Sequence, residues 1–516
     1  MAALARDKSQ KFAQVSSEGQ DEVSTMNWMT GHIIRTNLFF FLNVLVQGLR
    51  GLVLIPLFLR LMHPVGYGQW VLVMSWAGYA LVVALVGLDL SIYQYVTPKL
   101  RTDSGRSIYW MIVRIALFWT AALYLIVAGT AVGCATGDVT RIVLFGGLYV
   151  CGQTFWMLFL APFRCEERTY IFLLSQILIT LGDFLVTVFT AFAYRALPPI
   201  LFALAAYHLS VALLLFLIQR RRTPYRAPLK LPMRSYFTFG ASMTATQLIT
   251  MGFFVMDKSI ITYFTGLQTL ASYGPALSLA LILLPLSAAG TVTLPTLLVR
   301  TEVRNSVEIK KAILRSAIKH WGLLALPCAL GIAMLAQFAL TILASTALAK
   351  TGTSITWVAT AALLADGLTR FANVALRTEG DIYWPAYVKV VHFIVFLLVG
   401  VAAVAAEPHH AGLLVISTIL FTNLSYMIFC YARLRRYIPH LLQPRIFTTP
   451  LVGCAAITAW FVFSPALATV LNALLFVAIS VVIYGVVIMM MERVSPGKLA
   501  RTLFKFSPPQ IQAGQQ

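Results

Sequence analysis

Long apolar runs follow one another along almost the whole chain, separated by short polar segments. A membrane-spanning helix needs about 20 mostly apolar residues, and about fourteen runs meet that length. Their expected bounds are 37–59, 69–95, 108–133, 142–163, 170–193, 199–219, 237–264, 273–299, 320–343, 355–376, 385–406, 411–432, 447–464 and 466–491. No run alternates in polarity as barrel strands do, and backbone polar groups in lipid must be satisfied internally. The pattern predicts an all-α membrane protein with about fourteen transmembrane helices.

Composition and charge agree with this pattern. Hydrophobic residues make up 59% of the chain and charged residues only 11%, against about 25% in soluble domains. The net charge of +21 is strongly one-sided: 30 of the 39 lysines and arginines fall in the termini and in the loops that follow even-numbered spans, and only four fall in the other loops. Because cytoplasmic loops carry the excess of Lys and Arg, both termini are expected in the cytoplasm. The same distribution excludes nucleic acid as a partner.

Two sequence motifs recur half a chain apart. Tyr-Gly stands at the start of the second span, at 67–68, and of the eighth, at 273–274. Arg-x-Glu-x-x-x-Tyr ends the fourth span, at 164–170, and the tenth, at 377–383. Because six spans per half is an even number, both halves insert in the same direction, which implies two six-helix lobes related by a pseudo-two-fold axis along the membrane normal.

The expected domain organisation follows from these lobes. It comprises a cytoplasmic N-terminal tail at 1–35, an N-terminal six-helix lobe at 36–222, a basic cytoplasmic linker at 223–235, a C-terminal six-helix lobe at 236–434, two further C-terminal helices at 435–491 and a cytoplasmic tail at 492–516.

Polar and ionisable residues recur at spacings of three or four within several spans, which places them on single helical faces. They are Asn43, Gln47 and Arg50 in the first span, Asp89 at the end of the second, Gln176, Thr180, Asp183, Thr187 and Thr190 in the fifth, Thr246, Thr250, Asp257 and Lys258 in the seventh, and Asp366, Arg370, Asn373 and Arg377 in the tenth. Ionisable residues inside a span are costly and usually face a cavity or a partner. Arginine suits phosphate, and a carboxylate suits a coupling proton or sodium ion. Asp366 and Arg370 lie four residues apart, so a purely structural ion pair is the alternative.

The region from Asn43 to Asp89 carries a family resemblance. Its features are Gly48, Leu54-Ile55-Pro56-Leu57, Arg60, Pro64, Tyr67-Gly68 and Gly87-Leu88-Asp89-Leu90-Ser91, followed later by Asp257 and Tyr273-Gly274. With the span count and the two halves, the chain resembles bacterial polysaccharide flippases of the Wzx type, within the multidrug/oligosaccharidyl-lipid/polysaccharide exporter superfamily.

This resemblance implies a flippase of the bacterial inner membrane. It would move undecaprenyl-pyrophosphate-linked oligosaccharide units to the periplasmic leaflet by alternating access around a cationic cavity. The substrate role would fall to Asn43, Gln47, Arg50, Lys258, Arg370 and Asn373, and ion coupling, by H⁺ or Na⁺, to Asp89, Asp183, Asp257 and Asp366. Partners would include membrane lipids, a polysaccharide polymerase and a chain-length regulator. The helices at 447–491 resemble the extra pair of the lipid II branch, which offers a groove for the lipid tail.

Two other classes of protein compete with this interpretation. A multidrug-type small-molecule or cation antiporter shares the fold plan but usually has twelve spans and an acidic cavity. A polymerase or lipid-dependent glycosyltransferase normally presents a long external loop, whereas the outer loops here, such as 63–68 and 407–410, are very short. The chain has no Gly-rich phosphate loop and no His-Glu-x-x-His motif. We therefore expect a transporter that is not an enzyme and has no cofactor.

Overall fold

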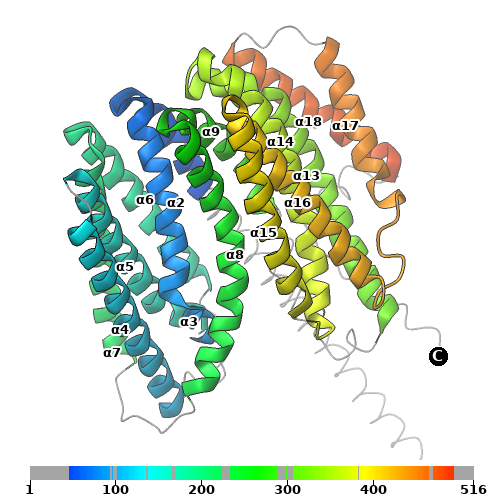
Figure 1. The fold of residues 1–516 in the computed structure, drawn as a ribbon. Helices are drawn as coiled ribbons and strands as arrows, with labels where there is room; N and C mark the ends of the chain where they lie inside the picture. The colour runs from blue at the N-terminus through cyan, green and yellow to red at the C-terminus, as the bar shows by residue number, and fades with distance from the viewer. Residues whose placement is uncertain are drawn as a thin grey trace, which may run out of the picture.

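The computed structural model describes residues 46–92, 96, 102–134, 137–165, 169–223, 233–286, 294, 298, 306–381, 383–463 and 469–492. Throughout this part of the chain the regular structure is helical, without strands (Figure 1). A first helix covers 46–61. The long helices that follow are α2 (His63–Leu85), α4 (Asp103–Cys134), α5 (Asp138–Cys165), α6 (Thr169–Tyr194), α7 (Leu197–Arg222), α8 (Met233–Thr265), α9 (Leu267–Ala280), α13 (Val307–Leu343), α14 (Thr346–Thr378), α15 (Tyr383–Ala406), α16 (Ala411–Leu434), α17 (Arg445–Phe463) and α18 (Val470–Glu492).

The expected number of spans is confirmed. Within the described residues, twelve helices are long and apolar enough to cross a membrane, and the helix at 46–61 and α14 bring the number to fourteen. α14 is less apolar because it is rich in Ala and Thr, and many of its residues are buried in the interior. A Cβ at Gly352 would contact Leu340 and Ala276, and the Thr356 hydroxyl donates to the Ala276 carbonyl at 3.2 Å. Small residues of this kind let helices approach closely inside a membrane.

The helices form two lobes side by side, with α17 and α18 on the outer flank of the second (Figure 1). The N-terminal lobe contains the helix at 46–61, α2 and α4–α7, and the described helices of the C-terminal lobe are α8, α9 and α13–α16. Each lobe has its own hydrophobic core, and in each the fourth and sixth helices, α5 with α7 and α14 with α16, make the most extensive packing contact. This correspondence agrees with the repeat expected from the sequence.

The lobes meet where α2 and α9 begin, and the repeated Tyr-Gly motif lies in this contact. A Cβ added at Gly68 would collide with the backbone carbonyl oxygen of Leu267, the first residue of α9. A Cβ at Gly274 would lie 3.2 Å from the Tyr67 hydroxyl. Tyr67 and Tyr273 are both buried. We call this contact the α2/α9 crossing. A shorter helix, α3 (Leu88–Ser91), touches α8 near the opposite end of α2.

The second copy of the Arg-x-Glu-x-x-x-Tyr motif ties three helices together at the turn between α14 and α15. Glu379 pairs with Lys310 of α13, and Asp381 pairs with Arg433 of α16 at 2.6 Å. Lys310 is helical because α13 begins well before the expected bound of 320, with the Ser306 hydroxyl capping its first turn. This charged extension was not part of an apolar run, which explains the difference. In the first copy, residues 166–168 lie outside the described part.

Candidate functional site

A charged cluster lies inside the N-terminal lobe, between three helices. A guanidinium nitrogen of Arg50 lies 2.6 Å from a carboxylate oxygen of Asp183 in α6. The Nε2 atom of His208 in α7 lies 3.6 Å from the same oxygen. Asp183 and His208 are buried, whereas Arg50 keeps 18% of its side chain exposed. The first and fifth spans therefore meet through an ion pair, which we call the Arg50–Asp183 pair.

The surroundings of this pair are aromatic and polar. The rings of Tyr149 and Trp156, both on α5, lie 5.0 and 6.3 Å from the His208 ring. The Thr187 hydroxyl donates to the Asp183 backbone carbonyl one turn before it, at 2.7 Å. Within the described residues, neither ring nitrogen of His208 has a hydrogen-bond partner. His208 is thus a buried titratable group held beside a carboxylate.

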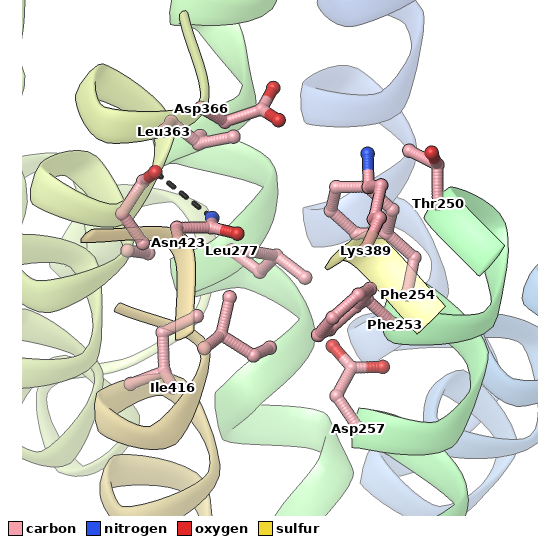
Figure 2. A pocket seen from close by; sticks show the side chains of 13 residues that line it. Thr250, Phe253, Phe254, Asp257, Leu277, Leu363, Asp366, Lys389, Ile416 and Asn423 are labelled. Atoms are coloured by element: carbon pink, nitrogen blue, oxygen red, sulfur yellow. Dashed lines mark hydrogen bonds between the residues drawn. The ribbon is translucent and has the colours of Figure 1, made fainter. Parts of the chain in front are cut away.

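A second polar site is a pocket inside the C-terminal lobe (Figure 2). It has a volume of about 30 Å³ and is lined from α8, α9, α14, α15 and α16. Its polar lining residues are Thr250, Asp257, Asp366, Lys389 and Asn423, and its apolar ones are Phe253, Phe254, Leu277, Ala359, Ala362, Leu363, Ile416 and Ile419. The carboxylates from the seventh and tenth spans therefore face one pocket, which we call the C-lobe pocket.

Asp257 has three hydrogen-bond donors around its fully buried carboxylate. The Tyr273 hydroxyl donates to one oxygen at 2.7 Å, and the Lys258 backbone N–H donates to the other at 2.6 Å. The Lys258 ammonium lies 3.2 Å from that second oxygen. A buried carboxylate is tolerated when it is paired with a cation and hydrogen-bonded. Here Lys258 supplies the cation, and Tyr273 of α9 and the Lys258 backbone supply hydrogen bonds.

Asp366 is neutralised within its own helix. Arg370, one turn later in α14, donates from Nε at 2.9 Å and from a terminal nitrogen at 2.8 Å to the same carboxylate oxygen. Asn373 lies one turn further along, where its side-chain oxygen accepts from the Tyr426 hydroxyl at 3.2 Å. The spacing of four residues in the sequence indicated the Asp366–Arg370 pair as the structural alternative, and this pair is present.

The remaining expected site residues are Asn43, Gln47 and Asp89. Asn43 lies outside the described residues. Gln47 is exposed on the first helix. Asp89 lies half-buried in the first turn of α3, near the end of α2 away from the α2/α9 crossing. The substrate and coupling roles expected for all these residues stay predictions.

Two ionisable residues in these sites were not singled out from the sequence. Lys389 of α15 lines the C-lobe pocket, and His208 faces Asp183. His208 has no polar neighbour at helical spacing and Lys389 has only His392, so neither belongs to a stripe of several polar residues. The available signal was the residue type, because an ionisable side chain inside a span marks a functional site by default.

Three of the cations in these clusters are already paired with carboxylates. Within the described residues, no group of three or more His, Cys, Asp or Glu side chains could bind a metal ion. Arg50, Lys258 and Arg370 each have a carboxylate within ion-pair distance. An incoming anion would therefore have to take such a cation from its carboxylate, leaving that carboxylate without its partner.

Comparison with known protein families places the chain. The family model described as polysaccharide biosynthesis protein matches residues 57–351, more than half of the sequence. The chain belongs to this polysaccharide biosynthesis protein family. Comparison with curated proteins gave no match.

Solved structures share the fold at low sequence identity. The lipid II flippase MurJ in an inward closed conformation superposes with a TM-score of 0.68 at 11% identity, covering 88% of this chain and 99% of the other. An inward-facing multidrug resistance transporter of the MATE family gives 0.61 at 12% identity, covering 79% and 98%. A MOP superfamily transporter from Pyrococcus furiosus, described as having a binding pocket of reverse polarity, gives a TM-score of 0.58 at 14% identity, covering 80% of this chain and 96% of the other. The chain thus has the two-lobed fold of these membrane transporters.

Proposed function

We propose that this protein is a flippase that moves undecaprenyl-pyrophosphate-linked oligosaccharide units from the cytoplasmic to the periplasmic leaflet during surface polysaccharide biosynthesis. The observation that carries the proposal is the pairing of a polysaccharide biosynthesis family match with a transporter fold that holds charged sites inside both lobes. A lipid-linked sugar is the substrate that joins polysaccharide synthesis to a membrane transporter. The protein acts as a transporter and not as an enzyme.

The Arg50–Asp183 pair supplies a physical route to substrate binding. Arg50 keeps part of its surface exposed and can donate two parallel hydrogen bonds to phosphate oxygens. When Arg50 turns to a pyrophosphate, Asp183 is left charged and buried. A buried carboxylate needs a new counter-charge, which a coupling ion would supply, so substrate binding and ion uptake support each other at this site. Arg370 and Asp366 form a second arginine–carboxylate pair in the C-terminal lobe, within the single helix α14.

The other proposed site residues divide in the same way into residues that contact the substrate and carboxylates that serve ion coupling. Asn43, Gln47, Lys258 and Asn373 contact the substrate with Arg50 and Arg370, and Asp89, Asp183, Asp257 and Asp366 serve ion coupling. Alternating access comes from rocking of the lobes, with the α2/α9 crossing opening and closing one end. The pair α17 and α18, which packs along α13, forms a groove for the lipid tail.

The proposed location is the bacterial inner membrane, with both termini in the cytoplasm. Exposed basic residues at the ends of α7 and α16, including Arg220, Arg221, Arg435 and Arg436, support this orientation. The α2/α9 crossing then lies at the periplasmic end. A polysaccharide polymerase and a chain-length regulator are the expected partners, acting on the delivered units.

A multidrug-type antiporter is the second candidate, favoured by the likeness to MATE structures. The two candidates differ in what accumulates when the protein is removed. In cells depleted of the protein, or carrying the Arg50→Ala, Arg370→Ala double variant, a flippase predicts complete lipid-linked units on the cytoplasmic leaflet. Unchanged lipid-linked sugars in both strains would favour the antiporter. Units that reach the periplasmic leaflet and stay unpolymerised would indicate a polymerase-like enzyme.

A further inference from the structure

The C-lobe pocket has one positive side chain more than its carboxylates need as partners. Asp257 is satisfied by Tyr273 and Lys258, and Asp366 accepts two N–H groups from Arg370. Both pocket carboxylates therefore already have their counter-charges. A free inorganic cation entering the pocket would have to displace Lys258 or Arg370 to gain a carboxylate.

Lys389 is a further positive charge in this pocket. Its ammonium lies 5.6 Å from the centre of the Tyr426 ring, as a cation–π contact. Within the described residues, Lys389 has no carboxylate within ion-pair distance and makes no hydrogen bond, and the charge of Asp366 acts on it only from a longer distance. A half-buried ammonium with three unused donors is unusual in a membrane interior. In Figure 2 its nitrogen points into the space between Asp366 and Thr250.

The rest of the lining limits what can enter. A volume of about 30 Å³ holds about two water molecules, so only a small group can enter. Asn423 donates its side-chain N–H to the Ala362 carbonyl at 3.2 Å, which leaves its oxygen as an acceptor. The Phe253 and Phe254 rings form an apolar wall. One small anionic group can reach Lys389, while a hydroxyl beside that group can donate to Asn423.

We propose that the C-lobe pocket is a subsite for one anionic oxyacid group of the transported molecule, a carboxylate or a phosphate, and that Lys389 is its binding residue. This inference rests on the proposed function, since it names the part of the lipid-linked oligosaccharide that this lobe recognises. A carboxylate would come from an acidic sugar, and a phosphate from the lipid carrier. The pocket then separates acidic from neutral oligosaccharides or recognises the carrier shared by both.

The test measures binding by the purified full-length protein in lipid nanodiscs. The probes are undecaprenyl pyrophosphate alone, an undecaprenyl-pyrophosphate disaccharide ending in glucuronic acid, and the same disaccharide ending in glucose. The variants are Lys389→Gln, Lys389→Arg and, as a matched control, Lys350→Gln at an exposed lysine in the same lobe. Losing a charge-assisted hydrogen bond weakens binding by roughly tenfold or more.

Each outcome decides the proposal. If Lys389→Gln weakens binding of the glucuronic acid probe alone, the group is a sugar carboxylate. If it weakens all three probes equally, while Lys389→Arg and Lys350→Gln bind normally, the group is a carrier phosphate. If Lys389→Gln binds all probes as tightly as the wild type does, the subsite is wrong and the flippase proposal is untouched. If the wild-type protein binds none of the probes, the proposed function fails, and this inference with it.

Discussion

At the scale of single residues, the Arg50–Asp183 pair joins two helices that are far apart in sequence. Removing one member of a buried pair leaves an uncompensated charge. We expect Arg50→Met and Asp183→Leu each to lower the free energy of unfolding by about 2–3 kcal/mol. The double variant should lose less than the sum, with a coupling energy of about 1–2 kcal/mol.

Unfolding in mild detergent, followed for the wild type, both single variants and the double variant, measures this coupling. The Asp138–Arg141 pair is the control, because both side chains are mostly exposed, at 76% and 67%. Its coupling energy should be within about 0.5 kcal/mol of zero. Additive losses at Arg50 and Asp183 would show that the two side chains do not form the pair.

The hydrogen bond from Tyr273 to the buried carboxylate of Asp257 gives a second prediction. Tyr273→Phe removes one hydroxyl and leaves the ring packing intact. We expect a loss of about 1–2 kcal/mol in the free energy of unfolding, because Asp257 keeps Lys258 but loses a donor. Tyr263→Phe, at a tyrosine that is 84% exposed, should change the stability little. Equal effects of the two substitutions would contradict this role for Tyr273.

How far the sequence could predict the site depends on the spacing of its residues. Spacings of three and four indicated the inward faces that carry Arg50, Asp183, Asp366 and Arg370. The pairing of Arg50 with Asp183 could not be predicted from the sequence, because it depends on how the first helix packs against α6. Lys389, which belongs to no long polar stripe, also needed the folded structure, because only the pocket shows that it has no carboxylate within ion-pair distance.

At the scale of elements, the α2/α9 crossing depends on residues without side chains. Gly68→Ala places a methyl group against the Leu267 carbonyl, and overpacking of this kind costs about 1–3 kcal/mol. Gly78→Ala lies on the same helix with no atom within 4 Å of the new Cβ, and it should be neutral or stabilising. Thermal denaturation distinguishes the two variants.

The same substitution should also act on the transport cycle. With the α2/α9 crossing held apart, a cysteine placed beside Leu267 should react faster with a membrane-impermeant maleimide in Gly68→Ala than in Gly78→Ala. Equal labelling rates would show that the crossing is not a gate.

Element positions could be predicted well because long apolar runs have no other stable form in lipid. The predicted bounds differ from the observed ones at α13 and α14, because the hydropathy of these helices does not mark where each helix begins and ends. The start of α13 is charged and continues as helix beyond the apolar run, and α14 is buried by protein, so its hydropathy falls below that of its neighbours.

At the scale of the whole molecule, the short Tyr-Gly and Arg-x-Glu-x-x-x-Tyr motifs correctly indicated two lobes. They recur because the same structural positions, the lobe contact and the end of the fourth helix, recur in each half. The motifs could not show that the Tyr-Gly copies of the two lobes touch each other.

The groove proposed along α17 and α18 can be tested by locking it. A Cβ at position 322 of α13 would lie 3.5 Å from the Phe447 ring of α17. In a variant without the native cysteines, Gly322→Cys with Phe447→Cys should form a disulfide that stops translocation, and a reductant should restore it. Full activity of the crosslinked protein would argue that α17 does not need to move for a lipid tail.

The most direct measurement of the central claim is leaflet exchange in vesicles. Purified protein is reconstituted with an undecaprenyl-pyrophosphate oligosaccharide in both leaflets, and a membrane-impermeant glycosidase is added outside. A flippase should make all of the oligosaccharide cleavable, whereas protein-free vesicles and the Arg50→Ala, Arg370→Ala variant should release only the outer-leaflet share. If the wild-type protein also releases only that share, under an imposed proton gradient as well as without one, the protein does not translocate lipid-linked oligosaccharide.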